Sequence, residues 1–307
     1  MDYRGLGKSG LKVSEIGLGT NTFGGRADEQ TSISIINEAL ELGINFIDTA
    51  ETYTQGRSEE IIGKAIKGKR PEVVIATKFG YRASIGPIGG GGSRNYIMKA
   101  VDSSLRRLNT DYIDLYYLHR PDSETPIEET MRTMDGLISA GKVRYLACSN
   151  FAAWQLSEAL WTSKFHNLES FIAVQPRYNL LDRSIERELV PCCQSYGVGV
   201  VPWGPLASGF LTGKYQRNQE IPARLNTSSI YGDVYTDANL NRLAKLEAFA
   251  EERSHSVGEL AIAWLLSHPW LGSVIAGATN AEQLSHNAAA VNWRLTTEDI
   301  IELDKIL

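Results

Sequence analysis

Short apolar runs alternate with amphipathic stretches along most of the chain. The apolar runs are bounded by glycine or polar residues, as is typical of strands buried on both faces. Eight such strands are predicted, at residues 16–19, 44–48, 73–78, 112–119, 143–148, 171–175, 197–203 and 273–276. Helical patterns lie between them, at residues 31–42, 94–108, 127–140, 152–161 and 184–195.

Glycines mark several joints between a helical pattern and the next strand. Gly43, Gly141 and Gly197 each stand where a helix can end in a left-handed residue. Strands that alternate with helices predict right-handed βαβ units and a parallel sheet. Eight units match a (β/α)8 TIM barrel, predicted here as a single domain over residues 1–307, with an N-terminal β-hairpin at residues 3–13 and an extra C-terminal helix at 297–307.

A doubly wound sheet is the competing architecture. Gly17, Gly19 and Thr20 stand where a dinucleotide fingerprint would begin, but the third glycine of that motif is absent. A Rossmann fold would also have to use Asp48 as its ribose-binding acid.

Composition narrows the class of partner. The chain has 307 residues and a net charge of -5, which argues against nucleic acid or an anionic membrane. Prolines and glycines interrupt the uncharged stretch 189–213, so no membrane helix is expected there. The first residues lack a secretory signal, which predicts a cytoplasmic protein with reduced cysteines. The expected partner is a small molecule, and the oligomeric state stays open.

The ends of the predicted strands carry polar side chains. In a barrel these residues face one another at one mouth. They are Asp48, Lys78, His119, Ser149 with Asn150, Gln175 and Trp203, and Tyr53 follows Asp48 by five residues. Each has an ordinary structural interpretation alone: Asp48 could cap a helix, and Tyr53 could be partly buried packing. Together they predict an active site.

The group suits proton transfer to a carbonyl oxygen while a hydride reaches the carbonyl carbon. We expect Lys78 to favour the phenolate of Tyr53, the general acid, and Asp48 to hold Lys78 charged. His119 would orient the carbonyl. A lyase or isomerase with Lys78 as Schiff base is the enzymatic rival.

A nicotinamide would fit the remaining strand ends. Ser149, Asn150 and Gln175 match its carboxamide, and Trp203 can stack on its ring. No metal site is predicted, because the other histidines are scattered and show no ligand spacing. Two long stretches, 81–93 and 215–237, are expected to be loops, and the first, which is rich in glycine, is expected to line the substrate mouth.

The motifs carrying these residues resemble the aldo-keto reductase family over nearly the whole chain. The matching segments are 16–20, 45–53, 77–78, 110–115 with His119, 141–145, 149–151, 204–209 and 211–214. The resemblance implies a (β/α)8 barrel that binds NADPH or NADH without a Rossmann fold, and a catalytic tetrad of Asp48, Tyr53, Lys78 and His119. Segments 203–206 and 277–284 are similar to the bacterial branch related to voltage-gated potassium-channel β subunits.

The resemblance also implies a cofactor site. Lys214 and the loop before it would hold the pyrophosphate, while Arg224 and residues 277–287 would hold the adenosine end. The full expected set is Gly19, Thr20, Asn21, Asp48, Ser149, Asn150, Gln175, Trp203, Gly204, Pro205, Leu206, Ala207, Ser208, Lys214, Arg224, Gly277, Thr279, Gln283 and Asn287. The amino terminus of a helix starting near Asn280 would offer free amides to a phosphate.

Three positions depart from the family pattern. Asn21 replaces an aromatic residue beside the substrate, Gln283 an arginine of some NADPH-preferring members, and His286 an acid near the adenine. The chain is therefore predicted to reduce aldehydes or ketones with NADPH, with NADH as a weaker alternative. The alternative function is a regulatory, redox-sensing subunit of the channel-associated type.

Overall fold

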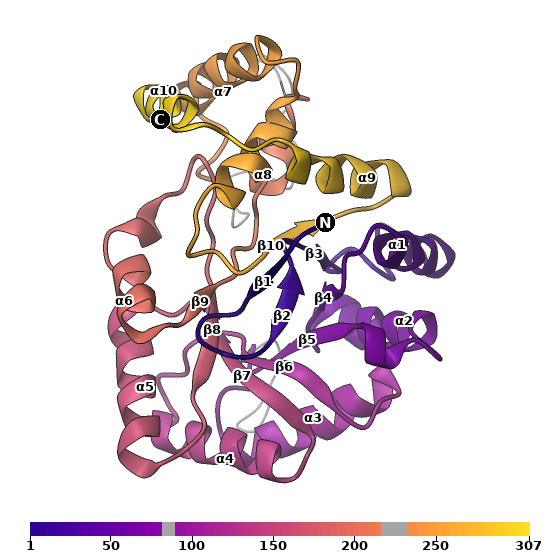
Figure 1. Cartoon of the computed structure of the whole chain (residues 1–307). Helices are drawn as coiled ribbons and strands as arrows, with labels where there is room; N and C mark the ends of the chain where they lie inside the picture. The colour runs from indigo at the N-terminus through magenta and orange to yellow at the C-terminus, as the bar shows by residue number, and fades with distance from the viewer. Residues whose placement is uncertain (82–89, 216–231) are drawn as a thin grey trace.

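The computed structural model describes residues 1–81, 90–215 and 232–307, and its centre is a parallel β-barrel (Figure 1). The sheet order is β10-β3-β4-β5-β6-β7-β8-β9. The strands are β3 (Ile16–Gly19), β4 (Phe46–Asp48), β5 (Val74–Phe79), β6 (Ile113–Leu118), β7 (Val143–Ser149), β8 (Phe171–Gln175), β9 (Gly199–Val200) and β10 (Val274–Gly277). The predicted eight-stranded (β/α)8 barrel is confirmed.

The barrel closes between β9 and β10. Parallel bridges join Val200 to Leu271 and Trp203 to Ile275. Two backbone bonds support them, from the amide of Gly272 to Val200 O (2.9 Å) and from the amide of Ile275 to Pro202 O (3.0 Å). No strand of the described barrel therefore keeps a fully unpaired edge.

Helices pack around the outside of this barrel (Figure 1). They are α1 (Glu29–Glu41), α2 (Arg57–Ala65), α3 (Arg94–Leu108), α4 (Ile127–Ser139), α5 (Ala153–His166), α6 (Leu189–Tyr196), α7 (Asp237–Glu251), α8 (Val257–Leu266), α9 (Ala281–Ala289) and α10 (Thr297–Ile306). The predicted C-terminal helix is α10. In the described residues no helix is long and apolar enough to cross a membrane.

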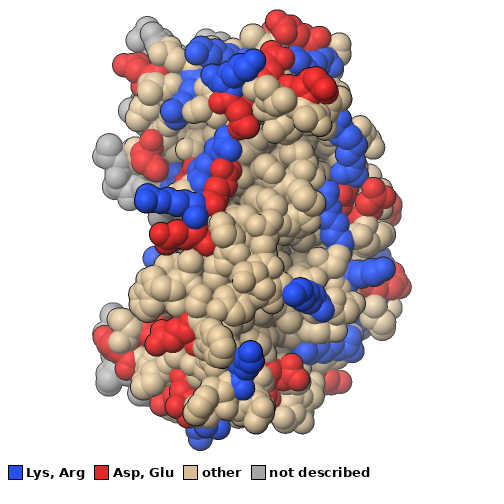
Figure 2. Space-filling view, turned by 60° about the vertical axis from the view of Figure 1, so that its left-hand side comes forward, with Lys and Arg blue, Asp and Glu red and all other residues tan. Residues whose placement is uncertain are grey.

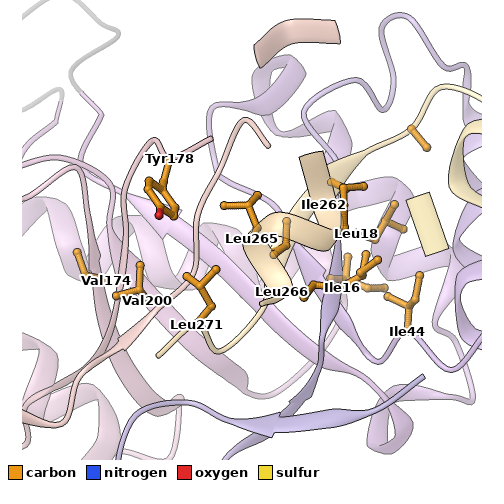
Figure 3. Close-up of a cluster of buried hydrophobic side chains, with 14 of the residues drawn as sticks. Ile16, Leu18, Ile44, Val174, Tyr178, Val200, Ile262, Leu265, Leu266 and Leu271 are labelled. Carbon is orange, nitrogen blue, oxygen red and sulfur yellow. The ribbon is translucent and has the colours of Figure 1, made fainter. Parts of the chain in front are cut away.

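Most apolar side chains fill the layer between strands and helices. Figure 3 shows part of it, where Ile262, Leu265 and Leu266 of α8 lie near Ile16 and Leu18 of β3. α8 is buried along nearly its whole length and lacks a polar outer face. That pattern hides the helical periodicity, because a helix that is apolar all round has no distinct stripe.

A smaller cluster fills the inside of the barrel. Phe46, Ala76, Leu115 and Ala147 point inward from consecutive strands. Side chains that point inward from the strands fill the interior of a TIM barrel. The interior is therefore packed, and chemistry is confined to the mouth.

The N-terminal hairpin, β1 (Tyr3–Gly5) and β2 (Lys12–Ser14), closes the end of the barrel opposite the mouth (Figure 1). Leu6 and Val13 are fully buried and belong to the inner cluster. Gly7 has a φ of 56°, and a Cβ there would lie 2.4 Å from the carbonyl oxygen of Gly197. Only glycine lets the hairpin backbone approach this closely.

Candidate active site

Four predicted residues gather at the carboxyl ends of adjacent strands. Asp48 ends β4, Lys78 lies one residue before the end of β5, and His119 directly follows β6. Tyr53 begins η1 (Tyr53–Gly56), a short 3-10 segment on the loop after β4. The mouth of a (β/α)8 barrel thus collects the four side chains at one place.

A buried chain of polar contacts joins three of them. Lys78 Nζ lies 2.5 Å from Asp48 Oδ1 and donates to Thr49 O (2.9 Å) and Tyr53 Oη (3.2 Å). Gln175 Nε2 donates to the other Asp48 oxygen at 2.8 Å. Lys78 is fully buried. The ammonium and the carboxylate therefore have fixed partners away from water.

The backbone after Tyr53 is held in an unusual conformation. Thr54 and Gln55 have φ values of 47° and 59°, in the left-handed region that β-branched residues rarely adopt. The hydroxyl of Thr54 donates to Phe23 O at 2.6 Å. Such conformations persist only when the surroundings enforce them, and they cluster at functional sites.

Burial and nearby charges together raise the pKa values of both Lys78 and Tyr53. Burial alone would lower the pKa of Lys78, but Asp48 and Tyr53 outweigh it, so the pKa is raised. Burial raises the pKa of Tyr53, and Lys78 opposes this only in part. The expected effect of Lys78 on the phenolate of Tyr53 is present, but desolvation of the phenolate exceeds the attraction of the ammonium. At neutral pH the phenol keeps its proton.

His119 is neutral at this site. Burial, with Lys78 and Arg120 nearby, lowers its pKa to about 3. Its ring lies 6.1 Å from that of Tyr53 and 5.3 Å from that of Tyr81, centre to centre. Its buried Nδ1 has no hydrogen-bond partner among the described residues. A neutral imidazole can donate one hydrogen bond without repelling Lys78.

The residues expected to contact the nicotinamide form a connected set beside the tetrad. Ser149 donates its hydroxyl to Gln175 O (2.8 Å), and Asn150 Nδ2 donates to His119 O (3.1 Å). Trp203 Nε1 donates to Asn150 Oδ1 at 3.0 Å, which fixes the indole at the mouth. The polar groups that would meet a carboxamide are thus pre-positioned.

The loop after β9 carries the next expected set, Gly204, Pro205, Leu206, Ala207 and Ser208. Ala207 and Ser208 have φ values of 45° and 57° at the start of η4 (Ala207–Thr212). The amide of Ala207 donates to Gly204 O (3.0 Å) and that of Gly209 to Leu206 O (2.8 Å), so the backbone of this turn is held by its own hydrogen bonds. Lys214 follows η4, and its Nζ lies 5.5 Å from the centre of the Tyr215 ring.

The segment after β10 leads into α9, as predicted. Asn280 caps that helix by accepting from the amide of Gln283 (2.9 Å). The side chain of Gln283 turns back and accepts from the amide (2.9 Å) and hydroxyl (3.0 Å) of Thr279. Asn287 Nδ2 donates to Gly277 O at 3.3 Å. The side chain of Gln283 is therefore held by Thr279 at the start of α9.

The end of β3 supplies Gly19, Thr20 and Asn21. A Cβ on Gly19 would lie 2.9 Å from Ile275 Cγ2, so the barrel wall leaves no room for a side chain. The hydroxyl of Thr20 donates to Asp48 O (2.8 Å) and is fully buried, whereas Asn21 is exposed beside Gly277. Thr20 thus supports Asp48 from behind.

Sequence reasoning missed two groups that support the site. Ser58 of α2 is within hydrogen-bond distance of the hydroxyls of Thr49 (2.9 Å) and Thr20 (2.8 Å), which ties α2 to the strand end carrying Asp48. Glu51 Oε1 accepts from the amide of Gly80 (3.0 Å) and from Tyr96 Oη (2.8 Å). No local pattern distinguishes these residues from an ordinary loop and helix start.

Other predicted features lie partly or wholly outside the described residues. These are Arg224 and most of the two long loops, at 82–89 and 216–231. The described part of the chain contains no cluster of three or more His, Cys, Asp or Glu that could hold a metal.

Comparison with known proteins assigns the chain to a family. The model of the aldo/keto reductase family matches residues 15–307. A probable voltage-gated potassium channel subunit beta of Arabidopsis thaliana is 40% identical, over 100% of this chain and 95% of that protein. Aldo-keto reductase YhdN of Bacillus subtilis is 36% identical, over 100% and 94%.

A third relative is named as an enzyme with a defined substrate. The L-glyceraldehyde 3-phosphate reductase of Escherichia coli K12 is 34% identical, over 99% of this chain and 92% of its own length. A family model that spans nearly the whole chain and relatives above 30% identity agree with the barrel. The chain belongs to the aldo/keto reductase family of oxidoreductases.

Proposed function

We propose that this chain reduces small aldehydes or ketones to alcohols with NADPH, and that Tyr53 is the general acid. One observation supports this above the others. The phenol of Tyr53 retains its proton and touches Lys78, which is itself held by Asp48 at 2.5 Å. A proton donor next to a fixed cation is what reduction of a carbonyl requires.

The residues present fit a nicotinamide cofactor. The left-handed turn at Ala207 and Ser208 can receive a pyrophosphate, and the amino terminus of α9 can receive a further phosphate. Ser149, Asn150 and Gln175 would hold the carboxamide, beside the indole of Trp203. When bound, the cofactor supplies the hydride that reaches the carbonyl carbon.

The tetrad would act on the carbonyl oxygen. Tyr53 donates its proton to that oxygen as negative charge develops on it. Lys78 then stabilises the phenolate left on Tyr53, because its ammonium lies 3.2 Å from the phenolic oxygen. Neutral His119 donates a hydrogen bond that orients the carbonyl. Asp48 keeps Lys78 charged and in place throughout.

Tyr53→Phe tests the proposal. The variant keeps the ring but lacks the proton, so kcat should fall by about 100- to 10,000-fold while the Kd for NADPH changes little. Steady-state reduction of an aldehyde panel and a cofactor titration measure the two quantities. The matched control is Tyr81→Phe, which removes another phenol near His119 and should stay within roughly threefold of wild type. A Tyr53→Phe enzyme as active as the control would remove Tyr53 from the mechanism.

The alternative function is a regulatory subunit of the channel-associated type that senses redox state through its cofactor, and the names of the channel-subunit relatives do not favour it over a reductase. Such a protein would complete one turnover and retain the product cofactor. Multiple turnovers at substrate saturation would exclude it. Borohydride trapping on Lys78 addresses the Schiff-base rival, and we expect no trapped adduct because the pKa of Lys78 is raised and its ammonium is committed to Asp48.

A further inference from the structure

The outer surface of α5 carries large aromatic side chains that lie in solvent. Trp154, Trp161 and Phe165 are 67%, 54% and 80% exposed, and Tyr196 of the adjacent α6 is 42% exposed. These four residues are called the aromatic face below. Seven- and eleven-residue spacings are about two and three helical turns, so Trp161 and Phe165 lie on the same side of α5 as Trp154.

The rest of α5 shows that this face is unusual. Its inner side is buried through Leu156, Ala159 and Ser163, and its outer side carries the aromatic residues beside Glu158 and Lys164. The neighbouring α4 instead carries an ion pair on its surface, between Glu128 and Arg132. Large apolar side chains that lie exposed next to one another mark interaction surfaces. Figure 2 turns the left-hand side of Figure 1 forward and shows uncharged surface at its centre, with acidic and basic side chains above and below it.

The aromatic face can be covered without leaving the polar group of Trp161 unpaired. The indole N–H of Trp161 donates to Tyr196 Oη at 2.9 Å, so covering that group leaves no unpaired donor. The ammonium of Lys164 lies over the Trp161 ring, 4.7 Å from its centre. Glu158 is the exposed acid on this side of α5. One acid and one base give the exposed side of α5 no net charge to repel an identical face.

We infer that the aromatic face is the contact between two copies of this chain, with the two α5 helices antiparallel about a two-fold axis. The exposed area and the lack of net charge support a second copy as the occupant. Trp154 and Phe165 lie equally far from a point between Glu158 and Trp161, so an antiparallel copy brings each Trp154 against the partner's Phe165. Aromatic pairs of this kind contribute beyond their buried area.

When fully covered, the four side chains reach the lower limit of area for a specific dimer. At roughly 150–250 Å² per aromatic side chain, the exposed fractions of the four residues leave roughly 500 Å² on each copy. Two copies therefore bury roughly 1,000 Å² through these side chains alone, which is the range at which specific interfaces begin. Trp, Tyr and Phe are also the residues enriched at the centre of such interfaces.

Sedimentation velocity over a concentration series tests the dimer. Wild type should sediment at twice the chain mass. Phe165→Glu should raise the dimer dissociation constant by roughly 30-fold or more, because it places a charge in the contact, opposite the partner's Trp154. Met98→Glu is the matched control, since Met98 is an exposed apolar residue of α3, away from the aromatic face. It should leave the dimer unchanged.

A pair of complementary variants tests the antiparallel register. Trp154→Lys and Phe165→Glu should each weaken self-association, but their mixture should form a mixed dimer in which the introduced ammonium of one copy faces the introduced carboxylate of the other. Both should keep wild-type circular dichroism and reductase activity, because the face lies away from the barrel mouth. The inference is overturned by a monomeric wild type at about 100 μM, well above typical specific dissociation constants. It is equally overturned by variants that remain dimeric, or by a mixture that gains no association.

Discussion

The buried ion pair between Asp48 and Lys78 is costly to maintain. Removing two charges from water costs several kcal/mol per ion, and only well-placed partners offset that cost. Here Gln175 and Thr49 supply them, at 2.8 and 2.9 Å. Replacing such a pair by apolar residues often stabilises a protein, so its presence indicates chemistry rather than stability.

Because His119 is neutral in the folded chain, it affects the stability of the protein at acid pH. Its pKa is lowered from 6.5 to about 3 by burial, Lys78 and Arg120. As pH falls, the imidazole of His119 therefore binds a proton near pH 6.5 in the unfolded chain but only near pH 3 in the folded chain. The contribution of neutral His119 to the free energy of unfolding is complete above pH 6.5 and is lost as pH falls from 6.5 to about 3. His268, with a pKa lowered to about 4, acts with the same sign.

We predict that His119→Asn flattens the acid limb of the stability profile. Between pH 6 and 4 the free energy of unfolding should fall less steeply than in wild type, by at most about 1.4 kcal/mol per pH unit for one proton. Urea denaturation at closely spaced pH values gives both slopes. Identical slopes in the two proteins would mean that His119 is protonated in the folded state.

Under the proposed function, we expect the choice between NADPH and NADH to depend on residues at the start of α9 and on Arg224. The side chain of Gln283 is engaged with Thr279, so it offers a 2′-phosphate little in its present position. A guanidinium adds a charge-assisted bond of ~1.5–3 kcal/mol that a neutral amide replaces only in part. The preference for NADPH over NADH should therefore be modest.

Gln283→Arg should widen that preference, and Arg224→Ala should narrow it by raising the Kd for NADPH roughly tenfold or more. Titrations of both cofactors against tryptophan fluorescence measure the change, with Trp203 as the expected reporter. Equal losses for NADH and NADPH in Arg224→Ala would place that arginine at the shared pyrophosphate, or away from the cofactor.

At the scale of elements, the strands were more predictable than the helices. Short, largely apolar runs gave eight strands, and β3 and β8 have the predicted bounds. α2 was missed because it begins within a loop, after Gly56 in a left-handed conformation. α8 was missed because it has no polar stripe. The predicted strand 197–203 is β9 (Gly199–Val200) followed by bridged loop, because Pro202 cannot donate to a ladder.

The site residues were also predictable only in part. Strand ends in a barrel must meet at its mouth, so Asp48, Lys78 and His119 could be found from their positions in the sequence. The hydroxyls of Ser58 and Thr49 could not, since their roles depend on how α2 lies against β4. The sign of the Tyr53 shift could not either, because burial is a property of the folded chain.

The N-terminal hairpin should act as a structural plug. Leu6→Ala would leave a cavity between the hairpin and the inner cluster and lower the free energy of unfolding by about 2–5 kcal/mol. Urea denaturation measures it, with Leu11→Ala, at a partly buried position on the same hairpin, as the milder control. The kcat of folded protein should stay near wild type, since the hairpin and the active site lie at opposite ends of the barrel. A loss of kcat instead would assign the hairpin a role in catalysis.

For the molecule as a whole, the seam between β9 and β10 implies an uneven local stability. Two bridges join these elements, whereas β6 and β7 share five registered pairs. The amides of Gly272 and Ile275 should therefore exchange with deuterium at least about tenfold sooner than those of β6, through openings smaller than global unfolding. Trp203 lies at this seam and Asp48 does not. We expect the part of the mouth around Trp203, where the nicotinamide is proposed to bind, to open locally as a separate unit. Cofactor exchange would then leave the buried Asp48–Lys78 pair intact.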